Sequence, residues 1–111
     1  MFKNKVILIT GAANGIGKKL VECYIEKGAT VIAADIDHEN GIKLVKQFGE
    51  HCIFIETDLR QEKDILDLFK TIREHYTKLD ILINNAGKMK TIDLFEHSSL
   101  DWDDIITLPL N

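Results

Sequence analysis

A glycine-rich turn between an apolar run and a helical pattern most strongly limits how this chain can fold. The turn occupies residues 10–17, Thr-Gly-Ala-Ala-Asn-Gly-Ile-Gly, and follows four aliphatic residues at positions 6–9. Gly11 can make the tight turn, Gly15 leaves room for a phosphate, and Gly17 allows the helix to pack closely on the strand. The N–H groups and positive end of the helix would then face an anion such as a pyrophosphate.

Such a turn alone is also compatible with a strand–helix connection that binds nothing, because glycine motifs occur by chance. Apolar runs at 5–10, 30–34, 52–55 and 79–83 alternate with helical patterns at 15–27, 37–48 and 61–76. Continuous apolar strands separated by helices are typical of a parallel sheet covered on both faces. We therefore expect a doubly wound α/β fold of about four strands in the order 3-2-1-4, as one domain over residues 1–111.

Local signals place the ends and the apolar sides of the helices. Asp37 is the expected N-cap of the second helix, and Gly28 and Gly49 are expected stop signals. The apolar residues expected to face the core are Ile42, Val45 and Phe48 in the second helix, and Ile65, Leu68, Phe69 and Ile72 in the third. A fourth helix is expected to start at Ser98, to carry Leu100, Trp102, Ile105 and Ile106, and to break at Pro109.

Composition disfavours several classes of partner. The net charge of −4 disfavours nucleic acid and anionic membranes, which need a basic surface. No apolar run is long enough to span a membrane, and we expect a cytoplasmic protein with Cys23 and Cys52 reduced, buried and structural. The four histidines lack metal-ligand spacing, so no metal site is expected.

Polar residues follow the strands at the edge where ligands bind in such folds. Asp35 lies 24 residues after Gly11, near where dinucleotide-binding folds place the acid that binds the ribose hydroxyls. A carboxylate there repels a 2′-phosphate, and no Arg or Lys occupies positions 12–14 or 34–37, so NAD is favoured over NADP. Each residue also has a plainer interpretation: Asp35 as a helix-terminal acid, Asp58 as a helix cap, and residues 84–87, Asn-Asn-Ala-Gly, as a simple turn.

Taken together in their order along the chain, these segments resemble the N-terminal motifs of the short-chain dehydrogenase/reductase family over about residues 3–108. The resemblance implies a Rossmann-type NAD-binding domain and, at family level, hydride transfer on an alcohol or carbonyl. It implies that the residues around the pyrophosphate and ribose are Gly11, Asn14, Gly15, Ile16 and Gly17. It also implies that Asp35 selects NAD, that Asp58 and Leu59 flank adenine, and that Asn84, Ala86 and Gly87 line the path to nicotinamide.

The chain departs from this family in its catalytic motifs. Family members are much longer and use a serine after a fifth strand and a Tyr-x3-Lys pair, but Gly28 lies four residues after Tyr24, and Asp80 four after Tyr76. No catalytic residue is assigned, and we expect the chain alone to be inactive, because hydride transfer would lack its acid–base partner. The family asparagine expected seven residues after Trp102 is replaced by Pro109, which suggests an altered reading frame or early stop.

Two functions remain open at this point: the cofactor-binding half of an oxidoreductase, or a non-catalytic NAD-binding or interaction module from a truncated gene. The truncated sheet would leave its fourth strand as an exposed edge. We therefore expect marginal stability, with self-association or a protein partner at that edge.

Overall fold

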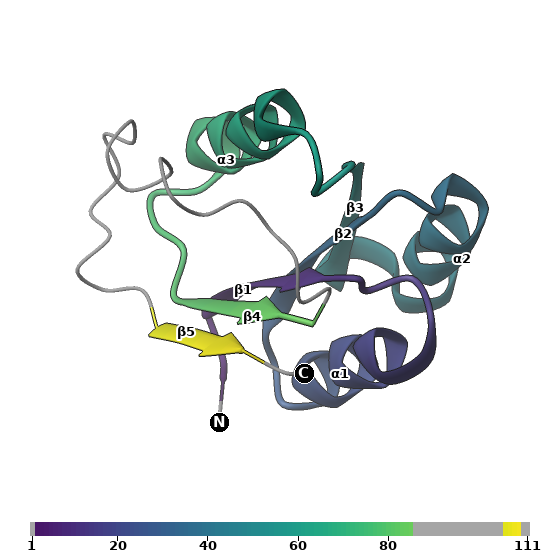
Figure 1. Ribbon diagram of the computed structural model, residues 1–111. Helices are drawn as coiled ribbons and strands as arrows, with labels where there is room; N and C mark the ends of the chain where they lie inside the picture. The colour runs from purple at the N-terminus through teal and green to yellow at the C-terminus, as the bar shows by residue number, and fades with distance from the viewer. Residues whose placement is uncertain (1, 86–105, 110–111) are drawn as a thin grey trace.

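A parallel sheet with the strand order β3-β2-β1-β4-β5 forms the centre of the computed structural model, which describes residues 2–85 and 106–109 (Figure 1). The strands are β1 Val6–Thr10, β2 Thr30–Asp35, β3 Cys52–Glu56, β4 Ile81–Asn84 and β5 Ile106–Pro109. The helices are α1 Gly15–Glu26, α2 His38–Phe48 and α3 Glu62–His75, with a short 3-10 helix, η1, at Gly49–His51. The predicted α/β class and the order 3-2-1-4 of the first four strands are confirmed.

Helices cover both faces of the sheet, which explains why its strands are apolar without alternation. On one face, α3 packs on Leu8, Ile32 and Leu82. On the other, α1 and α2 pack on neighbouring residues of the same strands, such as Ile7 and Ile83 (Figure 1). Since alternate residues of a strand point to opposite faces, the middle positions of β1, β2 and β4 carry apolar side chains on both faces.

The apolar side predicted for α3 is confirmed, whereas that of α2 is partly wrong. The four α3 residues named from the sequence are all buried. In α2 the buried residues are Gly41 and Leu44, while Ile42 is 38% exposed. The cause is the Phe54 ring of β3, which lies so close to Gly41 that a β-carbon there would collide with it. This contact turns α2 so that Gly41, and not Ile42, faces the sheet.

The two cysteines differ in burial. Cys52 is buried as predicted, and burial raises the pKa of its thiol to about 11, so it stays protonated at neutral pH. Cys23 is exposed on α1, so the prediction that both cysteines are buried is wrong for this one. In α1 it is Val21, and not Cys23, that packs against the sheet.

The fifth strand corrects the prediction for the C-terminal residues. Ile106 was expected in a helix, but Ile106–Pro109 pairs in parallel with β4, with Ile81 opposite Ile106 and Asn84 opposite Pro109. Residues 98–105 of that expected helix lie outside the described residues. A short apolar run pairs with an available strand regardless of the periodicity before it, and proline is tolerated on an edge strand. Consequently β5, and not β4, is the edge on this side of the sheet.

Asp80 fixes the alignment of the two central strands at their start. Its carboxylate accepts a hydrogen bond from the Val6 amide at 2.8 Å, and its own amide donates to the Val6 carbonyl at 2.9 Å. The Lys78 ammonium lies 3.2 Å from the same carboxylate. This register brings Thr10 opposite Asn84 at the other end of the strands, where the predicted site lies.

Candidate functional site

The glycine-rich turn connects β1 to α1 at the carboxyl end of the sheet. Gly11 and Gly15 adopt φ angles of +62° and +57°, which side chains strongly disfavour. At Gly17 a β-carbon would collide with the Gly11 carbonyl oxygen, so glycine is needed for α1 to start this close to the turn. Apart from its chain neighbours and the backbone of its own helix, no described atom lies within 4 Å of where a β-carbon of Gly15 would be. The turn is therefore tight on its inner side and open on its outer side.

Asn14 is the N-cap of α1, but in the described contacts its side chain does not cap the helix. Its amide nitrogen donates to Asp37 at 2.9 Å, and its amide oxygen accepts from Asn40 at 3.0 Å. Asn40 also donates to Asp37 at 2.7 Å, which closes a ring of three side chains. Because Asn14 is turned toward α2, the first amides of α1, including those of Ile16 and Gly17, are not covered by its side chain.

Asp37 is the N-cap of α2, as predicted, because its side chain accepts a hydrogen bond from the backbone amide of Asn40. The hydrogen bonds from Asn14 and Asn40 hold the pKa of the Asp37 carboxyl below its usual range. The group is therefore ionised at neutral pH, and it joins the start of α2 to the glycine-rich turn.

Asp35 is held by the turn beside it. One carboxylate oxygen accepts from the Ala13 amide and the other from the Asp37 amide, each at 3.0 Å. A carboxylate oxygen can accept two hydrogen bonds, so both oxygens retain capacity for a ligand hydroxyl. The two backbone contacts orient the carboxylate before any ligand arrives. It lies immediately next to the glycine-rich turn.

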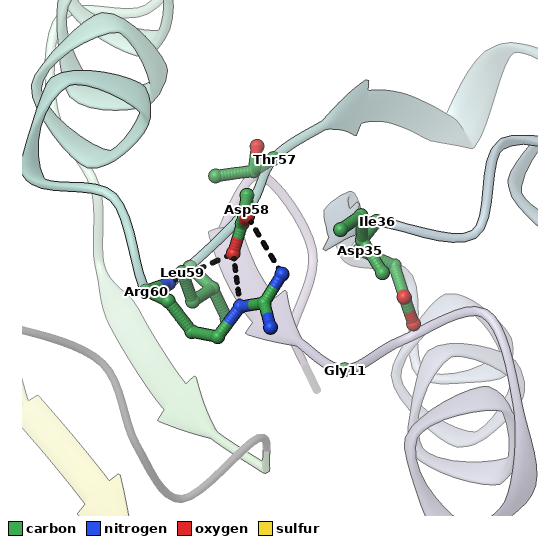
Figure 2. Close-up of a pocket in the computed structure, with 7 residues that line it drawn as sticks. All are labelled: Gly11, Asp35, Ile36, Thr57, Asp58, Leu59 and Arg60. Carbon is green, nitrogen blue, oxygen red and sulfur yellow. Dashed lines mark hydrogen bonds and ion pairs between the residues drawn. The ribbon is translucent and has the colours of Figure 1, made fainter.

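A pocket of about 390 Å³ lies between the ends of β2 and β3. Its lining residues are Gly11, Asp35, Ile36, Thr57, Asp58, Leu59 and Arg60. Figure 2 shows Asp35 and Ile36 on one side of this pocket and Asp58 and Arg60 on the other. Ile36 is 55% exposed although it is aliphatic. The structure thus brings together the residues predicted for ribose and for adenine around one hollow.

Asp58 does not cap α3, which is one of its two sequence interpretations. The N-cap of α3 is Gln61, while the Asp58 carboxylate binds the guanidinium of Arg60. The hydrogen bonds from Arg60 hold the pKa of the Asp58 carboxyl below its usual range, so it is ionised at neutral pH. Sequence reasoning missed Arg60, although its position two residues after Asp58 is a signal that the two could pair.

Asn84 and Asn85 lie at the end of β4, next to the glycine-rich turn. Asn84 accepts from the Thr10 hydroxyl at 2.9 Å, and the Asn85 amide donates to the Gly11 carbonyl at 3.0 Å. Asn85 therefore holds the turn in place, a role that its position in the Asn-Asn-Ala-Gly segment did not reveal. Ala86 and Gly87, the other residues predicted to line the path to nicotinamide, lie outside the described residues.

The described part of the chain shows neither a cluster of metal ligands nor a membrane-spanning helix. Among those residues, no three His, Cys, Asp or Glu side chains gather as a metal site would require. His38, for example, is exposed and lies 3.0 Å from Glu56. None of the described helices has the length and apolarity needed to cross a membrane.

Comparison with known families gives a match to short chain dehydrogenase over residues 5–111, which is nearly the whole chain. The chain belongs to the short-chain dehydrogenase family. Its relatives include a 3-hydroxyacyl-CoA dehydrogenase type-2 of Drosophila melanogaster, 34% identical over 86% of this chain and 37% of that protein. A 3-oxoacyl-[acyl-carrier-protein] reductase of Thermotoga maritima is 37% identical over 97% of this chain and 45% of that protein. This short-chain dehydrogenase chain thus spans less than half the length of these relatives.

Solved structures agree with this assignment. A 3-ketoacyl-(acyl-carrier-protein) reductase from Brucella melitensis, complexed with NADH, has a TM-score of 0.75 and 30% identity over 78% of this short-chain dehydrogenase chain and 36% of that chain. The RhlG/NADP complex of Pseudomonas aeruginosa has a TM-score of 0.71 and 28% identity over 85% of this chain and 39% of that chain. One neighbour contains NADH and the other NADP, so the likeness does not decide between the two cofactors.

Proposed function

We propose that this chain forms the NAD(H)-binding part of a short-chain dehydrogenase that transfers hydride between NAD and an alcohol or carbonyl. One observation carries the proposal: the glycine-rich turn, the oriented Asp35 carboxylate and the 390 Å³ pocket adjoin one another at the carboxyl end of the sheet. In open α/β folds ligands bind outside the carboxyl ends of the strands, and the glycine-rich turn lies where the strand order reverses, between β1 and β4. Family membership and neighbours that contain dinucleotides support the same site.

The described residues fit a dinucleotide from its adenine end to its pyrophosphate. The uncapped start of α1 offers the amides of Gly15, Ile16 and Gly17 to the phosphates, and the open side of Gly15 leaves space for them. Asp35 would accept from the ribose hydroxyls. The pocket beyond it would hold adenine between Ile36 and Leu59, with Asp58 at its edge. We propose that Asn84, Ala86 and Gly87 line the continuation toward nicotinamide.

The carboxylates around the adenosine site favour NAD over NADP. Asp35 would meet a 2′-phosphate directly, and its orientation is fixed by two backbone amides. Asp37 adds a second negative charge next to it. Among the described residues that line the pocket, Arg60 is the one cation, and it pairs with Asp58. A 2′-phosphate would therefore be repelled, with no unpaired cation among the described lining residues to compensate.

These residues bind and orient the cofactor, and we assign no catalytic residue among them. The bound nicotinamide would supply the hydride acceptor or donor. Since the 111 residues hold no Tyr-x3-Lys pair, they do not supply the family's proton-transfer group. The alternative, a non-catalytic NAD-binding module, shares this site. Its proposed docking edge at β4 is paired with β5. Turnover in a dehydrogenase assay on a broad panel of alcohols, if it is lost in Asp35→Arg, would favour the oxidoreductase over the non-catalytic module.

Binding of the two halves of the dinucleotide tests which part of the site these residues build. ADP-ribose should bind, by isothermal titration calorimetry, within about tenfold of NADH, because the described contacts serve adenosine and pyrophosphate. Nicotinamide mononucleotide should bind at least about 100-fold more weakly than ADP-ribose. Binding of the mononucleotide as tight as that of ADP-ribose would contradict the assignment of the pocket to the adenosine half.

A further inference from the structure

Arg60 binds Asp58 through a bidentate ion pair at the rim of the pocket. Its Nε donates to Oδ1 and its Nη2 donates to Oδ2, both at 3.0 Å. The backbone amide of Arg60 also donates to Oδ1 at 3.0 Å. A guanidinium and a carboxylate in this arrangement share one plane and lock each other's orientation.

The backbone on which this pair sits is fixed independently by α3. The Asp58 amide donates to a carboxylate oxygen of Asp64, in the first turn of α3, at 2.9 Å. The Asp58 carbonyl accepts from the Gln61 amide at 2.9 Å. Asp58 therefore has two backbone hydrogen bonds and a bidentate ion pair that orient it at the surface of the pocket.

The contacts leave Asp58 one specific way to bind a ligand. A carboxylate oxygen accepts two hydrogen bonds, and Oδ1 already accepts two, from the amide and the Nε of Arg60. Oδ2 accepts one from Arg60 and keeps one position. Asp58 thus presents a single acceptor with a fixed direction, and Figure 2 shows the pair on the side of the pocket opposite Asp35.

We propose that Arg60 is a specificity-determining positioning residue, which aims the one remaining acceptor of Asp58 at the base so that the site selects a 6-aminopurine over a 6-oxopurine. The inference rests on the proposed function, because it takes the pocket to hold the purine of a dinucleotide. An amino group at purine C6 donates to the carboxylate. A carbonyl at C6 is itself an acceptor, so it would leave two acceptors facing each other.

Without the guanidinium, the Asp58 carboxylate can turn and hydrate. It would still be an acceptor, but its direction would no longer distinguish a donor at C6 from the donor that a 6-oxopurine carries at N1. The loss of Arg60 should therefore reduce selectivity between bases more than it reduces affinity for NADH. If Arg60 only stabilised the fold, its loss would weaken the binding of NADH and of its hypoxanthine analogue equally.

The test measures the dissociation constants of NADH and of reduced nicotinamide hypoxanthine dinucleotide by fluorescence titration. The unmodified chain should prefer NADH by about 30-fold, since a site with a fixed hydrogen-bond acceptor rejects a mismatched group strongly. In Arg60→Ala this ratio should fall to below about fivefold. Arg60→Lys should give an intermediate ratio, because lysine restores the charge but not the planar fork. Lys63→Ala, which removes another exposed cation near the start of α3, should leave the ratio unchanged.

Three results would overturn the inference in distinguishable ways. An unchanged ratio in Arg60→Ala would show that Arg60 does not set base selectivity. A higher ratio would show that its guanidinium faces the base directly. If the folded, unmodified chain binds neither dinucleotide, the proposed function fails and this inference falls with it. Circular dichroism checks each variant, and if Arg60→Ala does not fold, the lowered ratio in Arg60→Lys carries the test.

Discussion

Replacing Gly17 with alanine is expected to weaken NADH binding by at least about 100-fold, because it would displace amides that donate to the phosphates, and each hydrogen bond to a charged group is worth about 1.5–3 kcal/mol. The added β-carbon would overlap the Gly11 carbonyl oxygen and approach the Asn85 amide. Gly11 belongs to the glycine-rich turn, and Asn85 holds that turn in place by donating to the same carbonyl. The turn must therefore move away from α1. We also expect the free energy of unfolding to fall by about 1–3 kcal/mol, the usual effect of overpacking.

Gly41→Ala is the matched control for this substitution. Gly41 also lies in a helix against the sheet, and its new β-carbon would collide with the Phe54 ring, which can rotate aside. This variant should be less stable in urea denaturation. Its dissociation constant for NADH should stay within about threefold of that of the unmodified chain, since the substitution leaves the glycine-rich turn in place. Equal losses of NADH affinity in the two variants would show that Gly17 acts through general stability alone.

Replacing Asp35 with serine is expected to weaken NADH binding by about 10- to 100-fold, because a hydrogen bond to a charged group is worth about 1.5–3 kcal/mol. NADPH binding should stay the same or become tighter, since the charge that repels its 2′-phosphate is gone. The preference for NADH should therefore disappear. Fluorescence titration with each cofactor measures both changes on one sample.

Asp67→Ser controls for the loss of one negative charge, because Asp67 is exposed on α3. It should leave both dissociation constants unchanged. Asp35 also accepts from the Ala13 amide, so circular dichroism must show that Asp35→Ser is folded. A parallel loss of NADH and NADPH affinity in the folded Asp35→Ser variant would contradict the role of Asp35 in selecting the cofactor.

The order of the first four strands was predictable because it follows from the alternation of elements and the handedness of crossovers. The core side of α3 was predictable for a similar reason, since its four apolar residues recur with helical period. The orientation of α2 was not, because it depends on the contact of the Phe54 ring with Gly41, which joins two elements. Likewise, Ile106–Pro109 is a strand because β4 lies beside it, which no local period reveals.

The grouping of candidate site residues was predictable because parallel strands bring their carboxyl ends to one edge. Asp35 and Asp58 came together around one pocket for that reason. Side-chain directions were not predictable. Asn14 turns to the start of α2, and Arg60 turns back onto Asp58, because both choices depend on hydrogen-bond partners supplied by the folded backbone. The role of Asn85 likewise needs the Gly11 carbonyl within its reach.

Titration of the purified 111-residue chain with NADH and with NADPH, followed by fluorescence, tests the central claim most directly. Circular dichroism on the same sample reports whether the chain is folded. The account predicts saturable binding of NADH at a dissociation constant at least about tenfold below that of NADPH, a difference of about 1.4 kcal/mol. A folded chain that binds neither cofactor, or that binds NADPH as tightly as NADH, would contradict it.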